Sequence, residues 1–284
     1  MPSIALATTQ RFPASHLMGI ARRSARIVGH SRGAGRLGRP TVAWSAFDGV
    51  VIRSCWDYHL RFAEFFAWVD RISALGVRVW NPPRILRWNA RKTDLHDLAV
   101  GGVRTVPTLW LTGDGAKRST FSLEQILADT GWDAVVVKPI VSASSHQTWR
   151  LSRDEARANH AIHDARLRAL VAGYGAMVQP FVPEIARDGE WSLLFFAGEL
   201  SHVVQKRAAR GDFRVQREFG GTFETMSLPT PRVLDAAERA LRGVPGEPLY
   251  ARVDGVILDA EDGAAERLTA AIARKLGKLG SESN

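Results

Sequence analysis

The chain has 284 residues, of which 45% are hydrophobic and 24% charged, and this is enough for one large domain or two to three small ones. Its single cysteine, Cys55, excludes an internal disulfide and favours a reducing, cytoplasmic location. No apolar run approaches the length of a membrane-spanning helix, and the first residues lack the basic start of a secretory signal, so we expect no membrane partner.

The formal net charge of +9 is concentrated near the beginning of the sequence. Seven of the 38 basic residues lie within residues 1–47, which contain no Asp or Glu, so the rest of the chain is close to neutral. Residues 18–40 are rich in Gly, Arg and Ser and lack a clear period, which predicts an irregular basic segment. A solvated or disordered stretch, a basic arm for nucleic acid and a shifted reading frame all remain open; we expect no specific nucleic-acid binding.

A first domain is predicted over residues 1–90 from alternating strands and helices. Residues 3–8 and 49–54 are candidate strands, and residues 60–75 carry an apolar stripe with helical spacing. A further strand over residues 77–80 ends at an Asn-Pro-Pro sequence. Such β-α-β alternation implies a parallel sheet.

Two further regions, residues 91–178 and 179–284, are predicted to mix helices and strands. In the first region we expect helices over 93–100, 121–129 and 152–171 and strands over 105–111, 134–139, 147–151 and 175–179. In the second we expect an extended stretch over 180–185, a hairpin of 190–196 with 199–205, a polar loop over 207–222, a helix over 231–242, a strand over 249–258 and a terminal amphipathic helix over 263–276.

The most informative stretch is residues 134–139 (AVVVKP) with the small residues that follow. The apolar run predicts a short buried strand that ends at Lys138, because Pro139 cannot donate a further backbone hydrogen bond. A buried ammonium needs an anionic partner, and a loop of small residues such as Ser142, Ser144 and Ser145 suits phosphate oxygens. The alternative is that Lys138 reaches solvent, since no G-x-x-x-x-G-K-[ST] motif is present.

Several motifs occur in a characteristic order. They are RK at 91–92, KP at 138–139, QPFV at 179–182, GEWS at 189–192, DFRVQ at 212–216, FGG at 219–221 and YARVDGV at 250–256. Together they resemble the ATP-grasp superfamily of carboxylate–amine ligases, and they are most similar to the O-ureido-serine cyclo-ligases of cycloserine biosynthesis and to glutathione-synthetase-like relatives. The resemblance covers roughly residues 43–259 and again the expected terminal helix.

The resemblance implies an α/β and α+β fold. A Rossmann-like pre-ATP-grasp domain over residues 1–90 would precede the small ATP-grasp subdomain over 91–178 and the large one over 179–284. ATP and Mg²⁺ are the implied cofactors, and a small amino-acid-like molecule is the implied substrate.

The resemblance also implies a nucleotide site. Its residues would be Lys92, Lys138, Ser142, Ser144, Ser145, Gln179, Phe181, Val182, Glu184 and Glu190. The two lysines would neutralise phosphates, although Lys92 would alternatively be an ordinary helix-surface lysine. The serine loop would be a mobile phosphate lid in which Ser and Ala replace the family's glycines. Residues 179–182 would contact adenine through their backbone, and Glu190, or less well Glu184, would bind the ribose.

Further residues match the reacting part of the family's site. Lys206 and Arg214 would face the γ-phosphate and the developing acyl phosphate, with solvated loop cations as the alternative. The substrate side would be formed by Arg53 for a carboxylate, Asp57 for an amine and Trp56 as a wall; the alternative for these three is a cap and core aromatic before a helix. Cys55 has no evident activating partner and is not predicted as a nucleophile.

Asp254 matches the first magnesium carboxylate of the family, and its spacing from Arg252 puts both side chains on one face of a strand. The family's returning strand with further acidic ligands is absent after Asp259, and only Glu261 and Asp262 would be available as substitutes. Two functions therefore remain: a ligase acting through an acyl phosphate, with ring closure if the nitrogen belongs to the same molecule, or a nucleotide-binding relic. The relic would have lost turnover through its incomplete metal site and a scrambled N-terminal domain.

Overall fold

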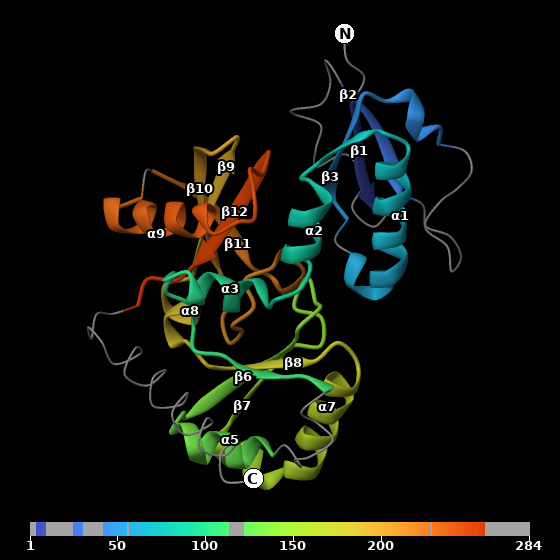
Figure 1. Ribbon diagram of the computed structural model, residues 1–284. Helices are drawn as coiled ribbons and strands as arrows, with labels where there is room; N and C mark the ends of the chain where they lie inside the picture. The colour runs from blue at the N-terminus through green and yellow to red at the C-terminus, as the bar shows by residue number, and fades with distance from the viewer. Residues whose placement is uncertain are drawn as a thin grey trace.

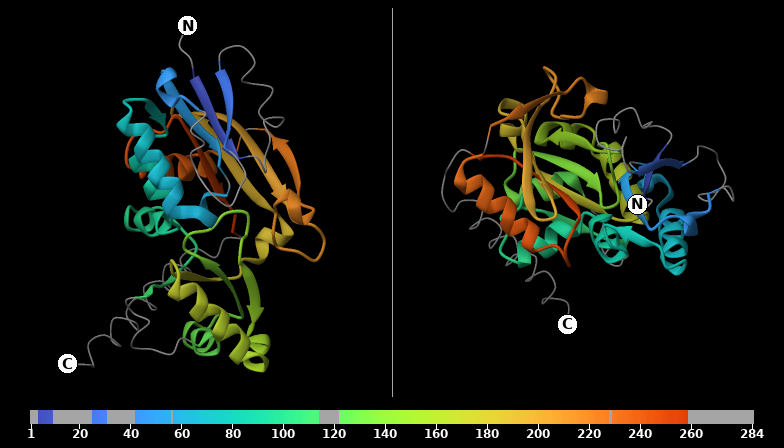
Figure 2. Two further views of the ribbon diagram at one scale, coloured as in Figure 1. Left: turned by 90° about the vertical axis from the view of Figure 1, so that its right-hand side faces the viewer. Right: turned by 90° about the horizontal axis from the view of Figure 1, so that it is seen from above.

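A computed structural model describes residues 4–9, 25–30, 42–55, 57–113, 122–227 and 229–258, which form three four-stranded sheets. In Figure 1 the N-terminal and C-terminal sheets lie side by side, and the central sheet lies below them. In the left view of Figure 2 the central sheet again lies below the other two, and in the right view the N-terminal and C-terminal sheets again lie apart. Among the described residues, no helix is long and apolar enough to cross a membrane.

The N-terminal sheet is parallel, with the strand order β2-β1-β3-β4. Its elements are β1 (Ile4–Thr9), β2 (Ala25–His30), β3 (Gly49–Ser54), η3 (Tyr58–Arg61), α1 (Phe62–Ala74), β4 (Arg78–Trp80) and α2 (Pro83–Asn89), with η2 (Trp44–Ala46) before β3. The apolar stripe of α1 is buried, as the helical spacing predicts: Phe65, Phe66, Trp68, Val69 and Ile72. The helix α2 was not predicted, although it begins with Pro83 at its first position.

The prediction of an irregular segment over residues 18–40 is wrong at β2. This strand pairs in parallel with β1, with Ile4 opposite Ala25. A six-residue strand is too short to show a convincing period, and its backbone hydrogen bonds come from β1, which is distant in sequence. The same pairing contradicts a scrambled N-terminal domain. The other residues of the basic segment lie outside the described part of the chain.

The central sheet is antiparallel, with the order β5-β8-β6-β7. Its strands and helices are α3 (Asp94–Val100), β5 (Leu109–Leu111), α5 (Leu123–Thr130), β6 (Ala134–Pro139), β7 (Trp149–Ser152), α6 (Arg153–Ala158), α7 (His160–Ala172) and β8 (Ala176–Pro180). The long helix predicted over residues 152–171 is two helices, because Asn159 leaves the helical conformation at φ −127° and ψ 31°. Strand β5 covers only the end of the predicted 105–111.

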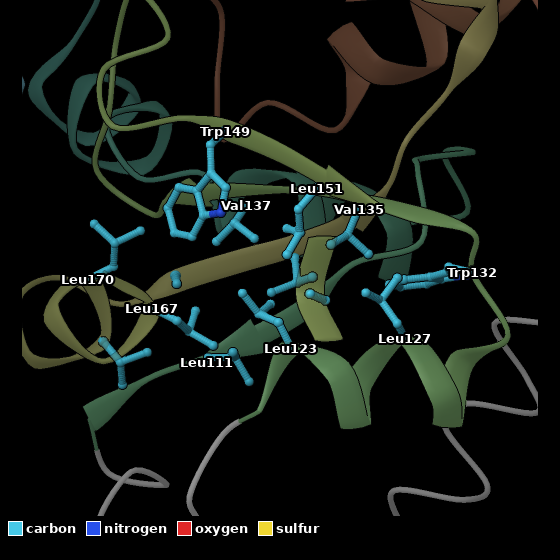
Figure 3. Packing of buried hydrophobic residues seen from close by; sticks show 14 residues of the cluster. Leu111, Leu123, Leu127, Trp132, Val135, Val137, Trp149, Leu151, Leu167 and Leu170 are labelled. Carbon is cyan, nitrogen blue, oxygen red and sulfur yellow. The ribbon is translucent and has the colours of Figure 1, made fainter. Parts of the chain in front are cut away.

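Alternation in the central sheet separates a core face from a polar face. Val135 and Val137 pack with Val178 against α5 and α7, as Figure 3 shows for the labelled core residues. The intervening residues, which include Lys138 and Gln179, therefore belong to the opposite face. In Figure 1 that face is turned toward the other two sheets, because α5 and α7 lie below the central sheet.

The C-terminal sheet is antiparallel, with the order β11-β10-β9-β12. Its elements are α8 (Pro183–Arg187), β9 (Glu190–Phe196), β10 (Glu199–Arg207), η4 (Arg217–Phe219), β11 (Thr222–Met226), α9 (Pro231–Arg242) and β12 (Tyr250–Gly255). The predicted hairpin and the helix over 231–242 are confirmed. The extended stretch predicted over 180–185 is partly wrong, because Pro183 occupies the first turn of α8, where its missing N–H costs nothing. The strand β11 was not predicted. Nearly all its residues are exposed, so its sequence lacks the alternation of apolar and polar residues that marks a half-buried strand.

The predicted terminal helix and the missing returning strand fall on residues 259–284, outside the described part of the chain.

The N-terminal and C-terminal sheets are joined through Asn81. Its side-chain amide donates to Tyr250 O at 2.9 Å, and its carbonyl oxygen accepts from the N–H of Leu249 at 2.8 Å. The Tyr250 hydroxyl in turn donates to Ile52 O on β3. These bonds hold β12 beside the end of the parallel sheet.

Candidate functional site

Lys138 lies at the end of β6 with a neutral partner. Its ammonium donates to Gln179 Oε1 at 2.9 Å, and no ion pair to Lys138 is found among the described residues. Burial lowers the pKa of Lys138 to about 8, repulsion from Lys92 adds to the effect, and Glu190 opposes it. The positive charge of Lys138 is therefore costly in the free protein, and among the described residues it is offset in part by the charge of Glu190 rather than by an ion pair.

Lys92 is placed beside Lys138 by the backbone. Its N–H donates to Ile140 O at 2.8 Å, which fixes the turn before α3 against the end of β6. Lys92 therefore lies before the helix, and the helix-surface alternative does not apply. The neighbouring Asp94 is buried, and burial raises its pKa to about 6, partly opposed by the Lys92 charge. Two lysines thus meet where the predicted phosphate loop begins.

The serine loop follows a backbone path that glycine would take more easily. Ser144, Ser145 and Gln147 have φ of 50°, 53° and 53°, in the left-handed region. Two side-chain bonds hold the loop: buried Ser142 donates to His146 O at 3.0 Å, and Ser145 donates to Gln216 Oε1 at 3.0 Å. The bond to Gln216 links the serine loop to the segment that carries Arg214. Its role as a phosphate lid stays a prediction.

The other side of the serine loop meets the N-terminal domain. The Tyr58 hydroxyl lies 3.3 Å from Ser142 O, and the rings of His59 and His146 lie 5.0 Å apart. Of the predicted substrate residues, Asp57 precedes Tyr58 and forms an ion pair with Arg61 at 3.0 Å. The backbone of Arg53 is near the end of β3, while its side chain and all of Trp56 lie outside what the structure describes.

Cys55 is buried beside the predicted substrate residues. Burial, with a smaller contribution from the charge of Asp57, raises the pKa of its thiol to about 12. The thiolate is therefore disfavoured, in agreement with the expectation that Cys55 is not a nucleophile.

The predicted hinge offers apolar cover, but part of its backbone is already engaged. The Phe181 N–H donates to Ala134 O at 2.9 Å, and Val182 O accepts from a backbone N–H of α8. The Phe181 ring lies 4.1 Å from the Arg150 guanidinium and meets the Phe213 ring edge-on at 6.1 Å. The Phe181 N–H is thus already paired within the protein. That residues 179–182 contact adenine through their backbone stays a prediction for their other backbone groups.

A charged cluster occupies one face of the C-terminal sheet. Lys206 on β10 contacts Glu190 on β9 at 2.7 Å and Asp254 on β12 at 3.2 Å. Asp254 also accepts from Ser192 and from the Arg252 guanidinium, at 2.8 Å for the latter. Burial would raise the pKa of Asp254, but the charges of Arg252 and Lys206 outweigh it and lower the pKa. The predicted shared face of Arg252 and Asp254 is confirmed by this ion pair.

The Arg214 side chain is bonded within its own loop and is not a freely solvated cation. Asp212 pairs with its guanidinium at 2.7 Å and also accepts from two backbone N–H groups. These bonds lower the pKa of Asp212 to about 2, and the bond from the Arg214 side chain contributes most. The guanidinium lies 3.7 Å from the centre of the Phe219 ring. Glu184, the weaker ribose candidate, lies on α8, and none of the side-chain contacts described for this chain joins it to the cluster.

The described residues do not form a magnesium site by themselves. They contain no group of three or more His, Cys, Asp or Glu side chains that could hold a metal ion. Both oxygens of Asp254 already accept from cationic side chains, and Mg²⁺ requires near-ideal octahedral geometry. The substitute ligands Glu261 and Asp262 lie outside the described part of the chain.

The site therefore divides into two groups of predicted residues. Lys92, Lys138, Gln179 and the serine loop meet at the central sheet, and Lys206, Glu190 and Asp254 meet at the C-terminal sheet. Glu190 links them, because its charge acts on Lys138 while its Oε1 binds Lys206. Prediction from the sequence did not name Thr108, Ser192 or Gln216 as site residues. Ser192 and Gln216 lie within the GEWS and DFRVQ motifs, which could have indicated them, whereas Thr108 has no such signal.

A parallel N-terminal sheet followed by two antiparallel sheets around a cationic site is the ATP-grasp fold, and the predicted resemblance to that superfamily is confirmed. Residues 4–81 match the family model of the D-cycloserine synthetase DcsG N-terminal domain. The cycloserine biosynthesis protein DcsG of Streptomyces lavendulae is 36% identical over 168 residues, which cover 59% of this chain and 54% of that relative. The match to this curated relative thus spans about half of its length.

Solved structures extend the likeness over nearly the whole chain. The crystal structure of D-cycloserine synthetase DcsG matches with a TM-score of 0.74 and 25% identity, covering 96% of this chain and 99% of that one. The D-alanine–D-alanine ligase of Bacillus anthracis complexed with ATP matches with a TM-score of 0.63 and 15% identity, covering all of both chains, and shows the shared fold alone.

Proposed function

We propose that this chain is an ATP-dependent ligase that forms a C–N bond on a small amino-acid substrate through an acyl phosphate. The observation that carries the proposal is Lys138, a half-buried cation that forms no ion pair with any described residue, beside a loop of small residues in an ATP-grasp fold. The likeness to the cycloserine proteins favours intramolecular attack, in which a nitrogen of the substrate closes a ring.

In this proposal the residues around Lys138 bind and orient ATP. Lys138 and Lys92 neutralise phosphate oxygens, and the serine loop covers them with backbone N–H groups. Phe181 gives the base apolar cover, and Glu190 accepts from ribose hydroxyls. The result is a γ-phosphate held toward the C-terminal sheet.

The remaining residues act on the reacting groups. The substrate carboxylate attacks the γ-phosphate, ADP leaves, and the resulting acyl phosphate is attacked by the nitrogen with loss of inorganic phosphate and a proton. Arg214, pre-oriented by Asp212, and Lys206 stabilise the charge that moves between these oxygens. Arg53, Trp56 and Asp57 are proposed to hold the amino acid.

Mg²⁺ is the metal proposed for this reaction class, since it neutralises phosphates during transfer. Asp254 is its proposed carboxylate, but the described residues do not fit the ion without a change in the contacts of Asp254. We therefore assign no step to the metal.

The test is a measurement of ADP and phosphate release by the purified chain with ATP, Mg²⁺ and O-ureido-serine, alongside other small amino acids. We expect ADP release that depends on the amino acid, and a cyclised product by mass spectrometry. Lys138→Ala should lose most of this activity, whereas Arg157→Ala, which removes an exposed cation of α6 in the same sheet region, should retain it. Nucleotide binding without ADP release would favour the relic instead.

A further inference from the structure

A chain of hydrogen bonds crosses the polar face of the central sheet. The Thr108 hydroxyl donates to Val106 O at 2.8 Å and accepts from Gln179 Nε2 at 2.9 Å. Gln179 Oε1 then accepts from Lys138 Nζ at 2.9 Å. Gln179 is only 5% exposed, so its amide cannot exchange these partners for water freely. The relay links a residue before β5 to the lysine at the end of β6.

The direction of every bond in this relay is determined. A carbonyl can only accept, so the single proton of the Thr108 hydroxyl goes to Val106 O. Thr108 must then accept from Gln179, which requires the NH₂ group of the amide on that side. Lys138 can only donate, which requires the carbonyl oxygen on the other side. Both ends of the relay therefore impose the same orientation on the Gln179 amide.

We propose that Thr108 is a positioning residue that sets nucleobase specificity: by holding the Gln179 amide in one orientation, it makes the site select a purine with a 6-amino group over one with a 6-oxo group. This inference rests on the proposed nucleotide site. Gln179 Oε1 retains a second lone pair beside Lys138, and an exocyclic amine can donate to it. A 6-oxo group at the same place would meet another carbonyl oxygen.

Recognition of the base depends more on the Gln179 side chain because part of the hinge backbone is already engaged. The Phe181 N–H is occupied by Ala134 O, so this backbone donor does not read the base. Rotating the Gln179 amide to present its NH₂ group to a 6-oxo base would break the bond to Thr108 and turn the NH₂ group toward the Lys138 ammonium. Both changes leave buried polar groups unpaired, which is the usual physical source of discrimination between substrates that differ by one donor.

The experiment compares ATP with inosine triphosphate by titration calorimetry, because the two nucleotides differ only at position 6 and in the proton on N1. The variants are Thr108→Val, which keeps the shape and removes the hydroxyl, and Thr108→Ser, which keeps the hydroxyl. Gln179→Glu is measured alone and together with Thr108→Val. A carboxylate presents oxygen on both sides, so its orientation needs no support from Thr108.

We expect the unmodified chain and Thr108→Ser to prefer ATP, and Thr108→Val to lose about five- to tenfold of that preference. Adding Thr108→Val to Gln179→Glu should leave the preference unchanged. An equal ATP preference in Thr108→Val and the unmodified chain, or an equal loss in both Gln179 and Gln179→Glu backgrounds, would overturn the role of Thr108 while leaving nucleotide binding intact. Failure of the unmodified chain to bind ATP would instead overturn the proposed function on which the inference rests.

Discussion

Two lysines of the site lie in opposite electrostatic surroundings. Lys138 on the central sheet has a neutral amide as its partner, and burial lowers its pKa to about 8. Lys206 on the C-terminal sheet is also buried but contacts two carboxylates, Glu190 and Asp254. An uncompensated cation is costly until an anion arrives, whereas a paired cation already stabilises its own sheet. Under the proposed function, Lys138 would serve nucleotide binding first, and Lys206 would serve both the stability of its sheet and the site.

The largest expected effect is on nucleotide affinity. Lys138→Ala removes a charge-assisted bond to a phosphate and should weaken ADP binding by roughly tenfold or more. Lys206→Ala should weaken ADP binding less, because its charge is compensated and it is proposed to face the absent γ-phosphate. Titration calorimetry with Arg157→Ala as the control measures both. Equal losses of ADP affinity in the two lysine variants would contradict the difference that we infer between Lys138 and Lys206.

The next effect is on stability. Asp254→Asn leaves Lys206 and Arg252 without their shared anion and should lower the free energy of unfolding by about 2 kcal/mol, after discounting for a side chain 32% exposed. Lys138→Met should destabilise little, because it removes a half-buried charge that has no ion pair among the described residues. Urea unfolding measures both, with Asp235→Asn on the exposed face of α9 as the matched control. A destabilised Lys138→Met with an unchanged Asp254→Asn would reverse our interpretation.

A smaller effect should appear with pH. Because the pKa of Lys138 is lowered to about 8 from 10.5, the unfolded chain binds more protons than the folded one between these values. The free energy of unfolding of the free protein should therefore rise with pH over this window relative to Lys138→Met. The full shift corresponds to about 3 kcal/mol, of which we expect about 1 kcal/mol because Lys138 is only half-buried. ADP affinity should fall over the same window as the charge is lost. A difference between the two proteins that does not vary from pH 8 to 10.5 would contradict the lowered pKa.

The smallest effect concerns the serine loop. Ser144→Gly should stabilise the chain by about 0.5 kcal/mol, because glycine adopts the φ of 50° without strain, and the gain exceeds the extra entropy of the unfolded chain. The same change in β10, Ser201→Gly, should instead destabilise. Thermal unfolding of both variants tests this prediction, and destabilisation of both would show that the loop is not strained at Ser144.

Much of the fold could be predicted from local patterns. The helix over residues 60–75, the strand that ends at Lys138 and the helix Pro231–Arg242 were all indicated by apolar spacing and helix-start signals. The strands β2 and β11 were missed because their stability comes from pairing with distant strands. Pro183 was misread because a proline that breaks one helix also begins another.

The sequence by itself determined which residue types the site contains and in what order they occur. Lys138, Glu190, Arg214 and Asp254 were predicted from motifs, since a motif preserves chemistry along the chain. Only the tertiary structure decided which charges compensate each other. Lys206 meets Asp254 across β9, and Thr108, just before β5, meets Gln179 on the neighbouring strand β8, because strand register brings together residues that are up to 71 positions apart. Such pairings depend on the register of the sheets, and no local pattern specifies it.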